Sequence, residues 1–570
     1  MNFSSTLDFK PALFTDLRGY SVRKFKADLI AGIVVGIVAL PLAIAFGIAS
    51  GVSPTVGLLT AIIGGFLVSA LGGSTVQIGG PTGAFIVIVY NIIQTFGLMG
   101  LAVATFMAGI ILVAMGLFRL GTIIKFIPYP IVVGFTAGIA LTIFSTQVND
   151  FFGLGLKDVP SEFIPKWQLY LSSLGQINWT TTIVGLVSLL IVIGAPRISK
   201  RLPGALISIV IVTAGCYIAS LYVPGFSIET IGERFGNMST DIPQPKGFDL
   251  NMATINLLLP SAFTIAVLGA IESLLSATVA DGVTGSRTNS NTELIGQGVA
   301  NIVVPFFGGI PVTGAIARTM TNITNGGRTP VAGIIHAVVL LLSFLFLMPL
   351  INLVPMACLA AVLIVVAYNM SGWRTVAHIF KAPGSDISVL IVTMLLTVIF
   401  DLTIAIEMGL LLAMVLFLKR VSGNTQIKVY GEQLDVAEGT DLPSSGEVLN
   451  VAEGVSVYEI DGPFFFGVAT KFDEMMRNTM HTKPKVRIIR MRKVSFIDAT
   501  GLHNLELLIS SSKSEGIEVV LSGVNPSVRN SLDHDGINRL LPESHICDHI
   551  TKAVQLANRL VAEKNETASK

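Results

Sequence analysis

The most constraining feature of the sequence is a long stretch without charge. From Leu29 to Phe118 there is not one Asp, Glu, Lys or Arg. A membrane-crossing helix needs about 20 apolar residues, so a stretch of about 90 residues allows several crossings. Helices are expected, because hydrocarbon offers no partners to an open backbone. With a mean hydropathy of +0.74 and 13% charged residues, the sequence predicts a polytopic membrane protein.

Fourteen apolar runs follow one another up to about residue 420. They lie at 29–48, 54–71, 83–96, 98–118, 122–145, 181–195, 203–223, 257–281, 293–308, 314–324, 331–351, 355–370, 385–401 and 402–419. The polar stretch Pro224–Asn256 separates seven runs from seven. Basic clusters precede the first run or follow an even number of runs, so the positive-inside rule predicts that both termini are cytoplasmic. The loops around Asp150–Lys166 and Gly225–Asp249 are then outside.

After residue 420 the composition changes to that of an ordinary soluble domain. Three short strands are expected at Val455–Ile460, Val486–Met491 and Val519–Ser522, with helices near Ala469–Thr479 and Gly501–Ser514. This alternation predicts a small α/β domain.

Two segments, one in each set of seven runs, interrupt the hydrophobic pattern in the same way. The segments Gly72–Ala84 and Gly308–Ala315 are rich in Gly, Pro and Thr, and each opens a short apolar helix. Paired broken helices are typical of transporter binding sites. Where an extended segment precedes a helix, the first amides of the helix lack a hydrogen-bond acceptor. These amides and the helix dipole favour the binding of an anion. The alternative is that the glycines only permit close helix packing.

Three polar residues lie inside the apolar runs near these segments. Arg318 is one turn into the second short helix, where it either adds positive potential for the anion or ends the span. Glu272 is a lone carboxylate in an apolar run, with Ser276 one turn on. The carboxylate could titrate or, with Ser276, ligate Na⁺, and either would couple transport to an ion gradient. The alternative is that Glu272 is a structural partner for Arg318 or for a neighbouring polar group.

The sequence lacks the signatures of several other classes of protein. No nucleophile–base pair, metal cluster or phosphate loop is recognisable, so no enzyme activity and no cofactor are expected. The three cysteines, Cys216, Cys358 and Cys547, are far apart and predict neither disulfide nor zinc site. The net charge of +1 does not suggest nucleic acid.

Five stretches together resemble the sulfate permease (SulP) family, equivalent to solute carrier family 26, in its bacterial branch. They are Ala39–Phe46, Gly80–Gly83, Leu268–Ser276, Glu293–Gly298 and Gly308–Arg318. Ser495–Leu502 also resembles the central motif of a STAS (sulfate transporter and anti-sigma factor antagonist) domain.

The resemblance implies a seven-plus-seven inverted repeat with a core domain (spans 1–4 and 8–11) and a gate domain (spans 5–7 and 12–14), an elevator-like motion, and a homodimer. It implies a cytoplasmic segment 1–27, a transport domain 28–420, a linker 421–450, a STAS domain 451–563 and a tail 564–570. The implied anion-binding residues are Pro41, Phe46, Thr82, Gly83, Ala84, Gly314, Ala315, Ile316 and Arg318. Glu272 and Ser276 are the implied ion-coupling residues.

The substrate is expected to be a small anion of the sulfate, bicarbonate or C4-dicarboxylate class, carried across a bacterial inner membrane. Leu42, Ile316 and Ala317 make the implied pocket less polar than in many animal members. The stretch around Glu272 is more similar to the bacterial dicarboxylate-transporting branch, which favours proton-coupled symport. Sodium-coupled bicarbonate or sulfate uptake is the alternative.

The C-terminal domain is expected to be regulatory. Thr500 takes the place of a serine that is phosphorylated in bacterial antagonist proteins, and a phosphate there could act as a switch for a cytoplasmic partner. The alternative for Thr500 is a helix-capping threonine. Two other functions are weighed: a nucleobase carrier of related fold, and a signalling protein whose membrane part only anchors the STAS domain.

Overall fold

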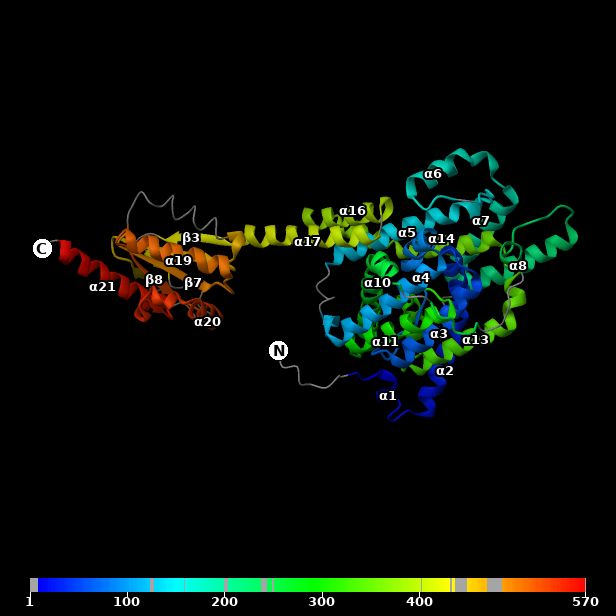
Figure 1. The fold of residues 1–570 in the computed structure, drawn as a ribbon, viewed down its shortest axis with the longest axis horizontal. Coiled ribbons are helices and arrows are strands. Elements are labelled where there is room, and N and C mark those ends of the chain that lie inside the picture. Colours follow the sequence, from blue (N-terminus) through cyan, green and yellow to red (C-terminus); the bar gives the residue numbers. More distant parts are fainter. Residues whose placement is uncertain are drawn as a thin grey trace. The chain divides into compact units, whose positions relative to one another are not determined.

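The computed structural model describes residues 9–122, 128–157, 159–198, 203–236, 243–248, 251–400, 402–430, 433–435, 448–468 and 484–568. The chain divides into two compact units, Met1–Ala413 and Met414–Lys570. Figure 1 follows the chain through both.

The first unit is helical. Its first part contains α1 (Ala12–Asp16), α2 (Val22–Ala49), α3 (Pro54–Leu71), α4 (Ile86–Leu117), α5 (Tyr129–Phe152), α6 (Phe163–Ser172), α7 (Trp179–Ile198), α8 (Gly204–Tyr222) and α9 (Ile231–Phe235). Its second part contains α10 (Met252–Thr284), α11 (Ser290–Val303), α12 (Ile316–Thr324), α13 (Val331–Ile351), α14 (Met356–Met370), α15 (Trp373–Ile379), α16 (Gly384–Ile399) and α17 (Leu402–Asn424), which crosses the boundary between the units. Within the described residues, nine helices are long and apolar enough to cross a membrane.

Each of the fourteen predicted runs has a helical counterpart, but several helix ends differ from the prediction. The runs at 83–96 and 98–118 form one element, α4, which breaks at Gly97. Gly97 has φ of 70°, a conformation that glycine adopts without steric cost. The fifth run, predicted at 122–145, is shifted to α5, because Pro128 and Pro130 fix the start of this helix.

The helices of the first unit pack in two groups. We call the first the core group, in which α2, α3 and α4 pack with α10, α11, α12 and α13. We call the second the gate group, in which α5 packs with α14 and α16, and α7 packs with α8 and α14. Each group combines helices from both parts of the sequence, as the predicted core and gate domains do (Figure 1).

The second unit is a five-stranded sheet with helices. The strands are β3 (Gln426–Tyr430), β6 (Val455–Asp461), β7 (Val486–Lys493), β8 (Glu518–Ser522) and β9 (Ile546–Cys547), in the order β3-β6-β7-β8-β9. β3 is antiparallel to β6, and the other neighbours are parallel. A separate pair joins β4 (Gln433–Asp435) and β5 (Val448–Asn450).

Helices cover this sheet on both faces. The helices are α19 (Ala499–Ser514), α20 (Pro526–Asp535) and α21 (Ile550–Ala568). Alternate strand residues point to opposite faces. Tyr458 and Ile489 therefore pack with α19 and α20, whereas their neighbours Val457 and Ile488 pack with α21. Burial on both faces explains why these strands are continuous apolar runs.

The three predicted strands are confirmed as β6, β7 and β8, and the helix predicted at Gly501–Ser514 is α19. The predicted helix at Ala469–Thr479 lies outside the described residues. Two segments differ from expectation. The predicted linker 421–450 contains β3, which pairs with β6, and also β4 and β5, which pair with each other. α21 continues to Ala568, into the predicted tail.

Candidate functional site

The two interrupted segments lie side by side in the core group. Gly79–Gly80 forms a two-residue strand, β1, which is antiparallel to β2, Thr313–Gly314. Gly79 is paired with Gly314 and Gly80 with Thr313. The amide of Ala315 also donates to the carbonyl of Ile78 at 2.9 Å. Segments more than 200 residues apart in sequence therefore form one small sheet.

A helix begins directly after each of these strands. After β1 come the 3₁₀ turn η1 (Gly83–Phe85) and then α4, and after β2 comes α12. The residues that precede them, Thr82 and Ala315, make no side-chain cap hydrogen bond to either helix. In the described part of the chain, neither N-cap side chain accepts from the first-turn amides that follow it, which is the arrangement that favours an anion.

Arg318 connects the two segments. Its side chain is 2% exposed, and its guanidinium donates to the carbonyl of Gly79 at 3.4 Å and to the carbonyl of Pro81. Gly80, with φ of 147°, leaves room for this side chain, because a methyl group there would overlap the guanidinium. Arg318 is therefore held beneath β1, close to the start of η1.

Glu272 faces the start of η1 from α10. The hydroxyl of Thr82 donates to Glu272 Oε2 at 3.2 Å, and Arg318 is near enough for its charge to act on this carboxylate. The predicted partner Ser276 is used differently: it donates to Thr319 Oγ1 at 3.3 Å, which also accepts the amide of Ile78 at 3.1 Å. Among the described residues no hydrogen bond joins Ser276 to Glu272.

The remaining predicted site residues have varied surroundings. Phe46 on α2 and Ala84 are buried, and a methyl group at Gly83 would lie 2.7 Å from Met370 Sδ, so gate-group side chains cover the start of η1. Pro41 lines a separate apolar cavity with residues of α8, α13 and α14. Ile316 is 38% exposed.

A second carboxylate of the core group was not predicted from the sequence. Glu293, on α11, is fully buried and accepts hydrogen bonds from five donors. These are Gly73 N (2.8 Å), Ser74 N (3.1 Å), Gln77 Nε2 (2.8 Å), Ser273 Oγ (3.2 Å) and Gln297 Nε2 (2.9 Å). Glu293 thus holds the chain that leads into β1. Glu293 and Gln297 are four residues apart, a spacing that places both side chains on one face of a helix, and this was the sequence pattern that could have indicated their hydrogen bond.

Asp28 is a further missed carboxylate, at the beginning of α2. It is fully buried and accepts from Tyr20 Oη at 2.9 Å, Thr329 Oγ1 at 2.5 Å and the amide of Arg328 at 2.8 Å. It therefore ties α2 to the loop that joins α12 and α13.

Thr500 lies in the first turn of α19 and is exposed. It does not cap the helix. Asp498 is the cap, since its side chain accepts from the amide of Gly501 at 2.8 Å and also from Phe466 N at 3.1 Å. The capping alternative for Thr500 is therefore wrong, and its hydroxyl is accessible from solvent.

Within the described part of the chain, no group of three or more His, Cys, Asp or Glu side chains could hold a metal ion.

Two models of known protein families match this chain. The model described as "Sulfate permease family" matches residues 25–393, more than half of the sequence. The chain belongs to the sulfate permease family. The model described as "STAS domain" matches residues 448–553.

Relatives cover almost the full length of this sulfate permease family member. It is 41% identical over 532 residues to the "Putative sulfate transporter YvdB" of Bacillus subtilis, covering 93% of this chain and 98% of the relative. It is 30% identical to the "Bicarbonate transporter BicA" of Picosynechococcus, covering 78% and 80%.

Solved structures agree on the fold. The murine Solute Carrier 26 family member A9 anion transporter superposes with a TM-score of 0.85 at 19% identity, covering 98% of this chain and 96% of that one. The transmembrane domain of BicA superposes with a TM-score of 0.61 at 30% identity, covering 68% and 98%. The sulfate permease family member is thus a multi-pass membrane anion transporter with a C-terminal STAS domain, not an enzyme.

Proposed function

We propose that this protein is a secondary active transporter that takes up a small anion together with a coupling cation carried by Glu272. The observation that supports this most directly is the meeting of Glu272, Thr82 and Arg318 at the start of η1. The hydrogen bond from Thr82 to Glu272 then joins the start of η1, where the anion would bind, to the carboxylate that would take the cation.

The anion binds between the starts of η1 and α12. Two helix N-termini without side-chain caps face this point from opposite halves of the sequence, and their dipoles favour negative charge. Arg318 adds a full positive charge behind β1. Its hydrogen bonds to backbone carbonyls fix the guanidinium in place, so it attracts the anion without becoming a mobile ligand.

Glu272 carries the coupling ion, which we propose is a proton. The carboxylate has one hydrogen-bond donor, Thr82, among the described residues, so a proton can be added without breaking a dense network. Na⁺ is the alternative, since the carboxylate of Glu272 and the hydroxyl of Thr82 offer the oxygen ligands that it prefers.

Transport follows an elevator-like movement of the core group against the gate group. Each group packs within itself, and Gly83 lies under Met370 of α14. Movement of η1 away from this cover opens the anion site. A rigid core group is needed for this, and the β1–β2 pair, Arg318 and Glu293 supply cross-links within it.

For the substrate, we propose a C4-dicarboxylate with proton coupling, and sulfate or bicarbonate as the second candidate. The second candidate is favoured by the names of relatives, which include a putative sulfate transporter and a bicarbonate transporter. The first rests on the resemblance of the stretch around Glu272.

We further propose that the protein is a homodimer in a bacterial inner membrane, with both termini in the cytoplasm and a regulator bound by the STAS domain. The exposed Thr500 is the proposed phosphorylation site. A protein that only anchors the STAS domain would show no anion flux.

Uptake by purified protein in liposomes tests the proposal. Succinate, sulfate, bicarbonate and chloride are offered separately, under an imposed proton gradient or an imposed Na⁺ gradient. We expect one anion to accumulate with the proton gradient, and Glu272→Gln to abolish accumulation. Accumulation that survives in Glu272→Gln contradicts the coupling role, and the absence of uptake for all four anions contradicts anion transport. Glu407→Gln, a change at an exposed carboxylate of α17, is the matched control.

A further inference from the structure

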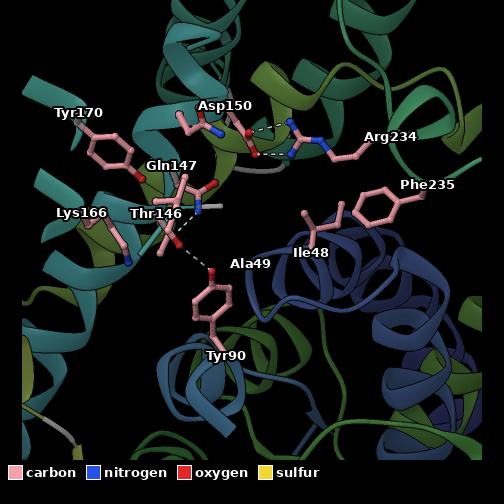
Figure 2. A pocket seen from close by; sticks show the side chains of 12 residues that line it. Ile48, Ala49, Tyr90, Thr146, Gln147, Asp150, Lys166, Tyr170, Arg234 and Phe235 are labelled. Atoms are coloured by element: carbon pink, nitrogen blue, oxygen red, sulfur yellow. Dashed lines mark hydrogen bonds and ion pairs between the residues drawn. The ribbon is translucent and has the colours of Figure 1, made fainter. Parts of the chain in front are cut away.

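We call the proposed anion site between the starts of η1 and α12 the half-helix site. A separate polar cavity of about 180 Å³ lies between the core and gate groups. Its lining comes from α2 and α4 of the core group, from α5 of the gate group, and from α6, α9 and the segment before α6. Figure 2 shows Lys166, Tyr170 and Tyr90 around this space, with Thr146 and Gln147 of α5 beside them. A single water needs about 10–15 Å³ of such a cavity, so there is room for a small anion and several waters.

Lys166 is the unusual group in this lining. Its side chain is 3% exposed, and within the described residues no carboxylate forms an ion pair with it. Its nearest described charge-stabilising contact is the ring of Tyr90, with Nζ 6.0 Å from the ring centroid. A buried ammonium without a counter-ion is costly, which points to an anion that binds there.

The other charges of the cavity are already paired. Arg234 donates to both oxygens of Asp150, at 2.9 and 3.0 Å, and to Glu229 at 2.5 and 2.9 Å. The carboxylates are thus held by Arg234 rather than by Lys166. Tyr170 is 2% exposed, and its hydroxyl makes no hydrogen bond among the described residues, so it adds an unused hydroxyl donor to the same lining.

The cavity and the cover of the half-helix site are neighbours along α5. Ile143 of α5 lies over Gly83, since a methyl group on this glycine would be 3.3 Å from Ile143 Cδ1. Gln147 lines the cavity and is four residues further along α5, or about one helical turn of 5.4 Å. An anion in the cavity is therefore about one turn beyond the side chains that cover the transport site.

We propose that this cavity is a second, external anion site, in which the ammonium of Lys166 and the hydroxyl of Tyr170 bind a small oxyanion or halide before it enters the transport site. The side on which it lies rests on the proposed function, whose orientation places the loop before α6 outside the cell. The binding itself does not depend on transport.

The site has a predictable dependence on pH. Burial lowers the pKa of Lys166 to about 8, so the ammonium is charged below pH 8 and loses its proton as the pH rises through that value. Anion affinity is therefore close to its maximum one pH unit or more below pH 8, and it approaches a fall of about tenfold for each pH unit above pH 8. Burial raises the pKa of Tyr170, which keeps its hydroxyl a donor across this range. The neighbouring charged groups Asp150 and Glu229 form ion pairs with Arg234.

Competitive acetylation tests the proposal without requiring transport. Reconstituted protein is treated briefly with acetic anhydride at pH 8 in the presence of increasing sulfate, bicarbonate, chloride or succinate, and modified peptides are quantified by mass spectrometry. We expect at least one anion to slow modification of Lys166 at least fivefold and saturably. Modification of Lys157, an exposed lysine of the same loop, should stay constant and serves as the internal control. If none of the four anions protects Lys166, the proposal is wrong.

Substitutions connect the site to uptake. Lys166→Met should raise the KM for uptake from outside about tenfold with little change in maximal rate, whereas Lys166→Arg should keep a low KM that no longer rises above pH 8. Tyr170→Phe, which retains the ring, should raise the KM about threefold. An unchanged KM in Lys166→Met, with normal expression, would overturn the role in uptake.

Protection of Lys166 should persist in Glu272→Gln. A loss of accumulation with intact protection separates a failure of coupling from a failure of the external site.

Discussion

Glu272 and Glu293 are two carboxylates of the core group, but they accept very different numbers of hydrogen bonds. Glu293 is fully buried and accepts five hydrogen bonds, two of them from backbone amides. Glu272 is half-buried and accepts one described hydrogen bond, from Thr82 at 3.2 Å. Glu272 lies in an otherwise apolar stretch, whereas Glu293 directly follows the polar residues Asn289–Thr292.

The difference teaches how to separate a structural carboxylate from one that is free to bind a cation. Five donors compensate the charge of Glu293 and leave little room for another ligand. Glu272 retains acceptor capacity and faces the start of a broken helix. The number of hydrogen bonds that each carboxylate accepts, rather than its burial or its position in a span, therefore supports the proposal that Glu272 is the coupling residue.

The largest expected effect is at Glu293. Glu293→Gln replaces an acceptor oxygen by an NH₂ group that faces donors, so at least one or two buried groups lose their partner at about 1–3 kcal/mol each. We expect a drop in melting temperature on the order of 5 °C or more, with poor expression, measured by fluorescence-detected size-exclusion chromatography over a temperature series. A variant as stable as the parent would show that the network is dispensable.

Glu272→Gln should instead separate transport from stability. Because only the bond to Thr82 is altered, the melting temperature should stay within about 2 °C of the parent, equivalent to less than roughly 1 kcal/mol. Exchange of labelled for unlabelled anion should continue, while accumulation against a gradient falls at least tenfold. A variant that unfolds would place Glu272 in the same structural class as Glu293.

Gly314→Ala tests the link between the Glu293 network and the anion site. A methyl group there would overlap the amide of Gln77, which is also held by Glu293 and Ser273. Overpacking of this kind costs about 1–3 kcal/mol, and we expect the KM for the anion to rise about tenfold.

Gly282→Ala is the matched control for Gly314→Ala, because nothing lies within 4 Å of the added group on α10. Equal KM values for both variants would show that Gln77 can move without cost to the site.

Thr82→Val should have the smallest effect of the four. It keeps the side-chain shape and removes the one described donor to Glu272, a bond worth about 1–2 kcal/mol. We expect the affinity for the coupling cation to change three- to tenfold, seen as a shifted dependence of uptake on external pH or Na⁺. An unaltered dependence would mean that Thr82 does not orient the carboxylate.

Much of the architecture was predictable because it depends on local patterns. The apolar runs predicted the helices, since length and hydropathy determine whether a segment can cross a bilayer. The strands β6, β7 and β8 were predicted from short apolar runs bounded by polar residues. β3 was missed because an edge strand with alternating polar residues resembles a linker.

Functional residues were predicted where their type was unexpected for their surroundings. Arg318 and Glu272 stood out as lone charges in apolar stretches. Glu293 did not, because an acidic residue in the first turn of a helix is ordinary. Lys166 also escaped notice, since a lysine in an amphipathic loop is expected to be solvated.

The sequence by itself determined that this chain spans a membrane, that it contains two broken helices and that these favour an anion. Only the tertiary structure decided which polar groups meet. The β1–β2 pair, the contact of Thr82 with Glu272 and the network around Glu293 join segments 190 or more residues apart. Hydropathy acts along the chain and can be read locally, whereas a hydrogen bond depends on the positions of two atoms that only packing brings together.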